Sequence, residues 1–341
     1  MRRIVAETRS PLSKLNRNHQ PLRVGTTLVG LLWLTLSLSG CAWLSDKERQ
    51  AALRPSADRP AQYIGNDTVG LRPGDLRFLV AVPAADSGAA LPSIDAMAAT
   101  AATPAVTAKT EQLALWWLPQ ADPHAPTLLY LHGTLRSLYY NLPKIEALRD
   151  AGFAVLAVDY RGWGDSTAII PSEATIAADV ETAWAELKRR QPLAGQRVIF
   201  GHSMGGAAAV TLASRLHYPS DYGALVLEST FTSLPDVAAT AGFWGRIGAA
   251  ITTLKFDSLA KIGRVDAPLL ILHGSADKTV PIELGQRLRD AARPGVRWVE
   301  VPGGSHSRLH ADAPEVYRQA MQDVIKGLAA PASSPIAATA N

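Results

Sequence analysis

The 341-residue sequence has a single cysteine, and only 19% of its residues are charged and 6% aromatic. One cysteine excludes an intrachain disulfide framework, and it also excludes zinc and iron–sulfur sites built from several cysteines. The histidines show no spacing typical of a metal site, so we expect neither a metal nor a cofactor. Hydrophobic residues make up 47% of the chain, which is enough for a large core and atypical of a disordered protein.

Positive charge is concentrated near the N-terminus. The whole chain has a formal net charge of +4, from 34 basic and 30 acidic residues. Residues 1–40 contain six basic residues and one acidic residue, which leaves 28 basic and 29 acidic residues for the rest. A nucleic-acid-binding domain needs a basic face of its own. Because the rest of the chain is close to neutral, we expect no nucleic-acid partner.

The first 41 residues have the features of an export signal in the usual order. After Arg23 comes an uncharged run of 15 residues, 24–38. This run is shorter than the roughly 20 apolar residues of a membrane-spanning helix. A basic region followed by a short apolar run is typical of a signal peptide. The only cysteine, Cys41, directly follows Leu38-Ser39-Gly40, which resembles the bacterial lipobox.

This resemblance implies that residues 1–40 are a lipoprotein signal peptide and that Cys41 is the lipid attachment point. The protein would then be anchored in the cell envelope, with the membrane as its partner. Ala42 stands where, in many Gram-negative lipoproteins, an aspartate favours retention in the inner membrane, so its presence favours the periplasmic side of the outer membrane. The alternative is an uncleaved membrane anchor with an incidental cysteine.

The rest of the chain divides into a linker, one domain and a tail. Residues 41–75 mix polar and apolar residues with several prolines and glycines, and we predict a tether. Residues 76–328 are predicted to form one domain, with a low-complexity insertion rich in Ala, Thr, Ser and Pro at 84–110. Residues 329–341 have a similar composition, which predicts a disordered tail.

Short apolar runs alternate with segments of helical spacing through this domain. The predicted strands are 75–82, 127–131, 153–158, 197–200, 224–227, 268–272 and 296–301. The predicted helices are 137–151, 172–190, 204–217, 283–292 and 313–328. This alternation predicts an α/β fold with a mostly parallel central sheet flanked by helices. Such sheets place their chemistry at the carboxyl ends of the strands.

A candidate nucleophile lies at the end of one of these strands. The segment Gly201-His202-Ser203-Met204-Gly205 matches G-x-S-x-G and follows the apolar run 198–200. A small-residue helical segment comes next, and this order predicts a nucleophile elbow that exposes the Ser203 hydroxyl above the sheet. Gly201 and Gly205 are needed because a side chain at either position would collide with the neighbouring strand and helix.

A serine nucleophile needs a base and an acid that orients the base. After a nucleophile elbow they follow in the order Ser, Asp or Glu, then His. His306, just after the pair Gly303-Gly304 in the loop behind the last strand, is the predicted base, with His310 as the alternative. Asp277, in the loop after the preceding strand, is the predicted acid. Glu228, which ends another strand, is the alternative acid.

Two main-chain N–H groups are predicted to form the oxyanion hole, which stabilises the tetrahedral intermediate. One belongs to Met204, directly after the candidate nucleophile. The other belongs to Thr134, in the loop after the strand 127–131. We expect His132 and His202 to serve in packing and loop hydrogen bonding.

The alternation of strand and helix pauses between Phe231 and Val265. This interval, 231–265, predicts a short helical cap above the site. Its apolar residues Phe243 and Trp244, together with Trp163 after the strand 153–158, are predicted to bind an acyl or aromatic substrate. The alternative is that these side chains pack the cap onto the sheet.

The landmarks above resemble the α/β-hydrolase superfamily over about residues 76–328. They include Leu-His-Gly at 131–133, Asp-Tyr-Arg-Gly-Trp-Gly-Asp-Ser at 159–166 and Gly-His-Ser-Met-Gly-Gly at 201–206. The chain is most similar to the serine-aminopeptidase-like, prolyl-oligopeptidase-like branch, which the segment 227–234 also resembles. Thr134 departs from that branch, where Asn is frequent. Ser203 disfavours dehalogenases and epoxide hydrolases, which use an aspartate nucleophile.

Together, these patterns predict a serine hydrolase that cleaves carboxylic ester or thioester bonds through an acyl-serine intermediate. Ser203 would attack, His306 would transfer the proton, and Asp277 would fix the tautomer of His306. The substrate would be a small molecule or another acylated compound. Three alternatives remain: a peptidase of the same fold, an acyltransferase of the same fold, and a non-catalytic envelope lipoprotein that keeps the fold as a binding surface.

Overall fold

The computed structural model describes residues 43–64, 70–85 and 110–328. The predicted signal peptide, Cys41, most of the 84–110 insertion and the tail 329–341 lie outside these residues. The chain divides into two units, Met1–Ser45 and Asp46–Asn341, and the fold below is that of the second unit. Among the described residues, no helix combines the length and the hydropathy needed to span a membrane.

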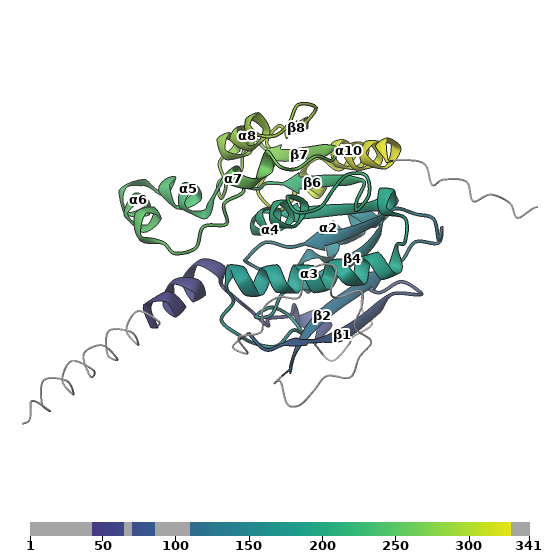
Figure 1. Cartoon of the computed structure of the whole chain (residues 1–341), viewed down its shortest axis with the longest axis horizontal. Coiled ribbons are helices and arrows are strands. Elements are labelled where there is room, and N and C mark those ends of the chain that lie inside the picture. The colour runs from purple at the N-terminus through teal and green to yellow at the C-terminus, as the bar shows by residue number, and fades with distance from the viewer. Residues whose placement is uncertain (1–42, 65–69, 86–109, 329–341) are drawn as a thin grey trace, which may run out of the picture. The chain divides into compact units, whose positions relative to one another are not determined.

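An eight-stranded sheet forms the centre of the fold, in the order β1-β2-β4-β3-β5-β6-β7-β8 (Figure 1). The strands are β1 (Leu76–Pro83), β2 (Thr110–Leu118), β3 (Thr127–Leu131), β4 (Ala154–Asp159), β5 (Arg197–His202), β6 (Ala224–Glu228), β7 (Leu269–Gly274) and β8 (Arg297–Val301). Strand β2 pairs antiparallel with both β1 and β4, and the remaining neighbours are parallel. The predicted α/β fold with a mostly parallel sheet is confirmed.

Strand β2 was not among the predicted strands. Its sequence, TEQLALWWL, directly follows the low-complexity segment, and it carries no polar motif at its end. Its apolar residues are nevertheless core residues, since Leu113, Leu115 and Trp116 are all 0% exposed. The guanidinium of Arg77 on β1 lies 4.0 Å from the ring centroid of Trp116, which gives the antiparallel pair a cation–π contact.

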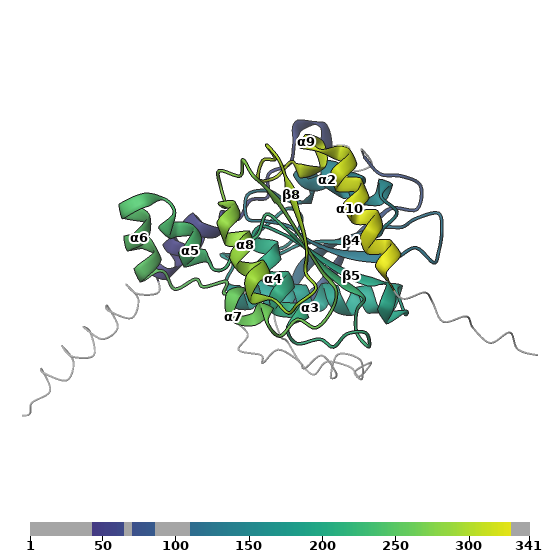
Figure 2. The ribbon, with the colours of Figure 1, turned by 90° about the horizontal axis from the view of Figure 1, so that it is seen from above.

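Helices cover both faces of the sheet (Figure 2). They are α2 (Leu138–Asp150), α3 (Glu173–Arg190), α4 (Met204–Ala213), α7 (Leu259–Ile262), α8 (Ile282–Ala291), α9 (Leu309–Asp312) and α10 (Pro314–Gly327). Successive residues of a strand point to opposite faces. On β3, Leu129 packs in the cluster with α3, α4 and α8, whereas Leu128 packs in the cluster with α2 and α10. Both faces are therefore buried, which explains the continuous apolar runs of the sequence.

Short helices follow β6 within the predicted cap interval. Helix α5 (Leu234–Ala239) is capped at its N-terminus by Ser233, whose hydroxyl accepts a hydrogen bond from the Asp236 N–H at 3.2 Å. Helix α6 (Gly242–Ile251) packs on α5 and buries none of its own residues. Both helices extend away from the sheet, at the left of Figure 1.

Residues 46–63 pack against the domain. They include helical residues 46–53 and the 3-10 helix η1 (Ala61–Tyr63). Leu53 and Tyr63 are 1% and 5% exposed, and each belongs to a core cluster. This part of the predicted tether thus has a fixed place, because its apolar side chains occupy core positions.

Candidate active site

Ser203 lies in a strained turn between β5 and α4. Its backbone angles are φ 56° and ψ −122°, a region costly for a residue with a side chain. Its N–H donates to the Glu228 carbonyl at 2.9 Å. Its own carbonyl accepts from the Gly206 N–H at 2.9 Å and from the Thr230 hydroxyl at 2.8 Å. These contacts hold the backbone conformation of a nucleophile elbow.

The two glycines of the motif allow close approach of the main chain. A Cβ atom on Gly201 would collide with the main chain of Gly205. A Cβ atom on Gly205 would collide with the carbonyl group of Leu131, at the end of β3. The turn therefore sits tightly between the sheet and the start of α4.

The structure brings Ser203, His306 and Asp277 together at the carboxyl edge of the sheet. The Nε2 atom of His306 lies 3.0 Å from Ser203 Oγ, and its Nδ1 atom lies 2.7 Å from Asp277 Oδ2. The other carboxylate oxygen of Asp277 accepts from the N–H groups of Thr279 at 2.9 Å and Val280 at 2.8 Å. The result is a continuous hydrogen-bonded row of hydroxyl, imidazole and carboxylate.

The charge state of Asp277 follows from its partners. Burial alone would raise its pKa, but the hydrogen bonds from His273 and His306 outweigh burial and hold the pKa of Asp277 well below its usual range. The group is therefore a carboxylate at neutral pH and accepts the proton on His306 Nδ1. That leaves His306 Nε2 as the acceptor facing Ser203.

The alternative acid and base have other positions. Glu228 is fully buried and accepts from Lys144 Nζ and from the Tyr317 hydroxyl, the latter at 2.9 Å. The His310 ring lies 6.1 Å from the Tyr317 ring, at the wall of the cavity described below. His306, and not His310, contacts both Ser203 and Asp277.

The loop after β3 lies directly against Ser203. A Cβ atom on Gly133 would stand 3.1 Å from Ser203 Cβ. The next residue, Thr134, is fixed through its carbonyl, which accepts from the Trp163 indole N–H at 2.8 Å. Met204 is the first residue of α4, so its N–H is one of the donors that a helix leaves unpaired at its start. The two predicted oxyanion residues thus flank Ser203.

His202 supports the His306 loop, in agreement with its predicted role in loop hydrogen bonding. Burial holds the pKa of His202 well below its ordinary value, so the ring is neutral. Its Nε2 atom lies 3.0 Å from the main-chain carbonyl of His306 and donates to it.

A cavity of about 540 Å³ opens beside Ser203 and His306. The loop 133–136, α2 and the segment after His306 form its walls. Three basic residues line it, namely Arg136, Lys144 and Arg308. The lining contains no aspartate or glutamate among the residues that the structure describes.

The three side chains predicted to bind substrate lie outside this wall. Trp163 is fully buried, and its indole N–H donates a hydrogen bond to the Thr134 carbonyl. Phe243 and Trp244 are 70% and 79% exposed on α6, because the cap helices extend away from the sheet. None of the three lines the cavity, whose wall on this side includes Tyr140 of α2, and their role in substrate binding stays a prediction.

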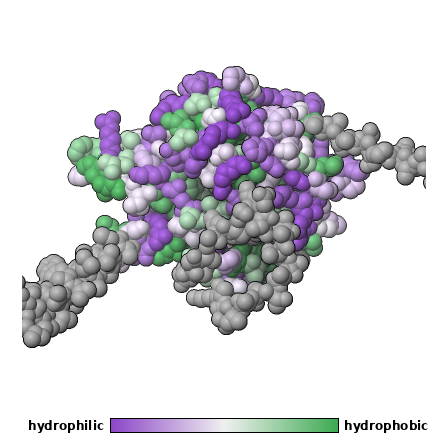
Figure 3. Space-filling model, in the orientation of Figure 1, coloured by the Kyte–Doolittle hydropathy of each residue, from purple (hydrophilic) through white to green (hydrophobic). Residues whose placement is uncertain are grey.

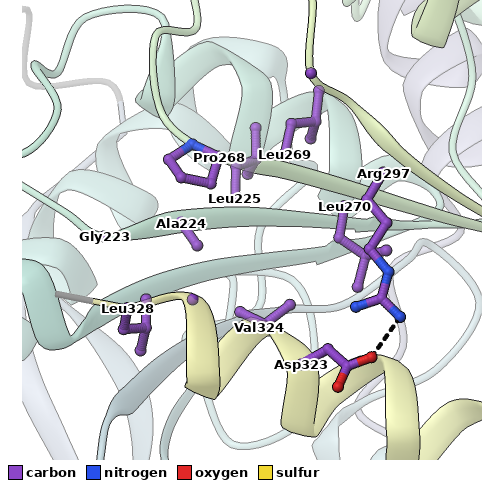
Figure 4. A pocket seen from close by; sticks show the side chains of 12 residues that line it. Gly223, Ala224, Leu225, Pro268, Leu269, Leu270, Arg297, Asp323, Val324 and Leu328 are labelled. Carbon is purple, nitrogen blue, oxygen red and sulfur yellow. Dashed lines mark hydrogen bonds and ion pairs between the residues drawn. The ribbon is translucent and has the colours of Figure 1, made fainter. Parts of the chain in front are cut away.

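A smaller cavity of about 120 Å³ lies at the other end of the sheet (Figure 4). It is formed by the starts of β6 and β7 and by α10. Its wall is mostly apolar, apart from the ion pair of Arg297 and Asp323 at 2.7 Å. Among the described residues of this wall none is a serine, cysteine or histidine, so the candidate site is the one at Ser203. Across residues 43–64, 70–85 and 110–328, no group of three or more His, Cys, Asp or Glu side chains could hold a metal ion.

Comparisons with known proteins agree with this architecture. Residues 122–254 match the family described as serine aminopeptidase, S33. The chain is 34% identical over 194 residues to an uncharacterised protein of Mycobacterium tuberculosis, which covers 56% of this chain and 67% of that protein. It is 33% identical over 197 residues to the lysophosphatidylserine lipase ABHD12 of Danio rerio, covering 52% of this chain and half of that lipase.

Solved structures show the same fold. The esterase Pf2001 of Pyrococcus furiosus superposes with a TM-score of 0.52 at 22% identity, covering 64% of this chain and 87% of the esterase. Est1E of Butyrivibrio proteoclasticus, solved with ferulic acid, also gives 0.52, at 19% identity, covering 64% of this chain and 96% of Est1E. The chain belongs to the α/β-hydrolase superfamily, in the S33 serine-aminopeptidase-like family, and its relatives include a lysophosphatidylserine lipase.

Proposed function

We propose that this protein is a serine hydrolase that cleaves carboxylic ester or thioester bonds through an acyl-serine intermediate. The observation that carries the proposal is the hydrogen-bonded row from Asp277 through His306 to Ser203, with distances of 2.7 and 3.0 Å, beside an open cavity. A strained serine paired with an imidazole and a buried carboxylate is the arrangement that activates a hydroxyl for acyl transfer.

The chemistry proceeds in two halves. Ser203 Oγ attacks the acyl carbon while His306 Nε2 takes its proton, and the N–H groups of Met204 and Thr134 stabilise the oxyanion. His306 then protonates the departing alcohol or thiol. Water enters, gives a proton to His306 Nε2 and attacks the acyl carbon. As the bond from the acyl carbon to Ser203 Oγ breaks, His306 returns the proton to Oγ, which releases the acid and restores both residues. Asp277 stays ionised throughout, and no cofactor takes part.

The cavity wall supports an acylated small molecule that carries negative charge. Arg136 and Arg308 both line the cavity, and its described lining includes no acidic side chain. The Nε atom of Arg308 lies 3.9 Å from Asp312 Oδ1, at a solvent-exposed position that leaves the guanidinium accessible. Lysophosphatidylserine, which names the relative from Danio rerio, is an ester of this kind. We therefore assign the substrate to anionic acyl esters or thioesters.

An aminopeptidase is the second candidate, because the matching family carries that description. A free α-ammonium group calls for an acidic partner in the site. The acid-free described lining of the cavity favours ester over aminopeptide substrates. An acyltransferase would differ by passing the acyl group to an added alcohol in preference to water.

Labelling and turnover test the hydrolase proposal together. A fluorophosphonate probe should label the protein at Ser203, and Ser203→Ala should lose both labelling and hydrolysis while keeping its unfolding transition. Turnover is measured on p-nitrophenyl esters of increasing chain length and on aminoacyl amides. Unchanged ester turnover by Ser203→Ala would overturn the assignment, and faster amide cleavage would favour the aminopeptidase.

We also propose that Cys41 carries a lipid and anchors the protein in the cell envelope, on the periplasmic side of the outer membrane. The support is the lipobox-like sequence Leu38-Ser39-Gly40-Cys41 after a basic and then apolar stretch. Mass spectrometry of the membrane-extracted protein should show a diacylglyceryl-modified N-terminal cysteine. A Cys41→Ser variant should retain the mass of the full precursor, and processing without Cys41 would contradict the proposal.

A further inference from the structure

Helix α6 presents an apolar face to solvent. The exposed fractions of Phe243, Trp244, Ile247 and Ile251 are 70%, 79%, 40% and 75%. With the spacing i, i+1, i+4 and i+8 they fall on one side of the helix, within an arc of about 100°. Figure 3 shows hydrophobic side chains gathered at the left, where Figure 1 places α6. Large apolar side chains that are exposed together on a monomeric soluble protein usually mark an interaction site.

The candidate cavity does not use this face. None of these four side chains lines the cavity beside Ser203, whose walls come from other elements. The face is therefore free to meet a partner outside the molecule.

The chemistry of α6 fits a lipid surface. Its single charged residue is Arg246, and the next charged residue, Lys255, is also basic and exposed. Aromatic and aliphatic side chains beside basic ones are typical of a helix that lies in the headgroup boundary of an anionic bilayer. At 10 residues, α6 is too short to span a bilayer, but it can lie along the surface.

The start of the described chain is tied to the end of α6. The Glu48 carboxylate accepts from the Thr253 N–H at 2.8 Å and from the Thr253 hydroxyl at 2.7 Å, two residues after α6 ends. Cys41 precedes Glu48 by seven residues, which span at most about 25 Å when fully extended. A lipid on Cys41 would therefore enter the bilayer within reach of α6.

We propose that α6 lies in the surface of an anionic phospholipid bilayer, with Phe243, Trp244, Ile247 and Ile251 facing the acyl chains. This second contact orients the protein on the membrane. It rests on the proposed envelope location, but it does not require acylation of Cys41.

A thiol-linked, environment-sensitive fluorophore tests the inference on the full chain. Cys41→Ser removes the only native thiol, and Trp244→Cys then places the label on α6. The control label is at Leu193→Cys, an exposed apolar position at the amino end of β5, opposite Ser203. With vesicles of phosphatidylcholine and phosphatidylglycerol, emission at position 244 should shift to the blue and become protected from iodide, while emission at position 193 should not change.

A second variant isolates the apolar face. Ile247→Gln with Ile251→Gln, added to the labelled chain, should remove most of the iodide protection, because two large apolar side chains no longer gain from leaving water. The matching Leu193→Gln change should leave the protection intact. Hydrolysis of a short soluble ester should be unchanged by both, which separates this inference from the proposed hydrolase function.

Three results would overturn the proposal. The label at position 244 could show no blue shift and no iodide protection when vesicles are added. The two glutamine substitutions could also leave the iodide protection of this label unchanged. Protection could also develop without vesicles as the protein concentration rises, which would assign the face to a second copy of the chain.

Discussion

At the scale of single residues, His306 is fixed by three contacts that need no ligand. Its ring meets Ser203 and Asp277, and its main-chain carbonyl accepts from His202. The ring is therefore held in one orientation, which in the proposed reaction would lower the entropy cost of reaching the transition state.

Replacing Asp277 tests this orientation. Asp277→Asn keeps the shape but no longer enforces the tautomer with Nε2 free, so we expect kcat to fall on the order of 10⁴-fold. Steady-state kinetics on a p-nitrophenyl ester measures the loss, with circular dichroism as the control for folding. A fall of less than about tenfold would show that Asp277 does not orient the base.

The same residue predicts a dependence of stability on pH. The folded state lowers the pKa of Asp277 below the unfolded value of about 3.9. Its contribution to stability is therefore complete above that unfolded value and is lost as pH falls through the lower folded pKa. Denaturation of wild type and Asp277→Asn should differ most at neutral pH, and the difference should shrink below about pH 4. A constant difference down to low pH would contradict this.

At the scale of elements, a buried ion pair attaches α2 to β6. Lys144 and Glu228 are 2% and 0% exposed and contact each other directly, and burial lowers the pKa of Lys144. Such a pair is costly to break from one side, because the remaining charge stays buried without a partner.

Lys144→Met should therefore destabilise the protein by about 3–5 kcal/mol, as read from chemical denaturation. The double variant Lys144→Met with Glu228→Gln should recover part of that loss, because it removes the stranded charge. If the single and double variants are equally unstable, the loss comes from packing and not from charge.

The elements that could be predicted from the sequence were those with both a clear apolar pattern and a recognisable motif at one end. Strands such as β3 and β5 are apolar runs that end in a polar motif, and the glycine spacing around Ser203 predicted its elbow. β2 was missed because a low-complexity segment precedes it and no polar motif follows it, and only tertiary pairing places it between β1 and β4. The cap interval 231–265 does contain short helices. Their direction depends on packing between α5 and α6, which no periodicity encodes, so the sequence did not predict the exposure of Phe243 and Trp244.

At the scale of the whole molecule, the basic residues that line the cavity should make the protein prefer anionic substrates. Arg136→Gln with Arg308→Gln should raise KM several-fold for anionic esters and leave KM for neutral esters unchanged, because each exposed contact is worth about 1 kcal/mol or less. Added salt should also weaken the preference of the wild-type protein for anionic over neutral esters, because it screens exposed charges. An equal rise in KM for both classes of ester would point to a change of cavity shape.

Part of the predicted tether, residues 46–63, packs into the fold. Leu53→Ala should lower the free energy of unfolding by about 2–5 kcal/mol, because Leu53 is 1% exposed within a core cluster. Ile64→Ala, at a position 70% exposed, is the matched control and should change stability by less than about 0.5 kcal/mol. Equal, small effects would mean that the segment before β1 is a tether after all.

The placement of α6 has a kinetic consequence. Because none of its apolar side chains lines the cavity beside Ser203, binding to lipid would change the location of the proposed enzyme and would not open its site. On a short water-soluble ester, vesicles should therefore leave kcat unchanged and produce no lag. For substrates dissolved in the bilayer, the rate should follow their surface density. The proposed enzyme would then show no interfacial activation, and its dependence on membranes would come from being held where its substrates are concentrated.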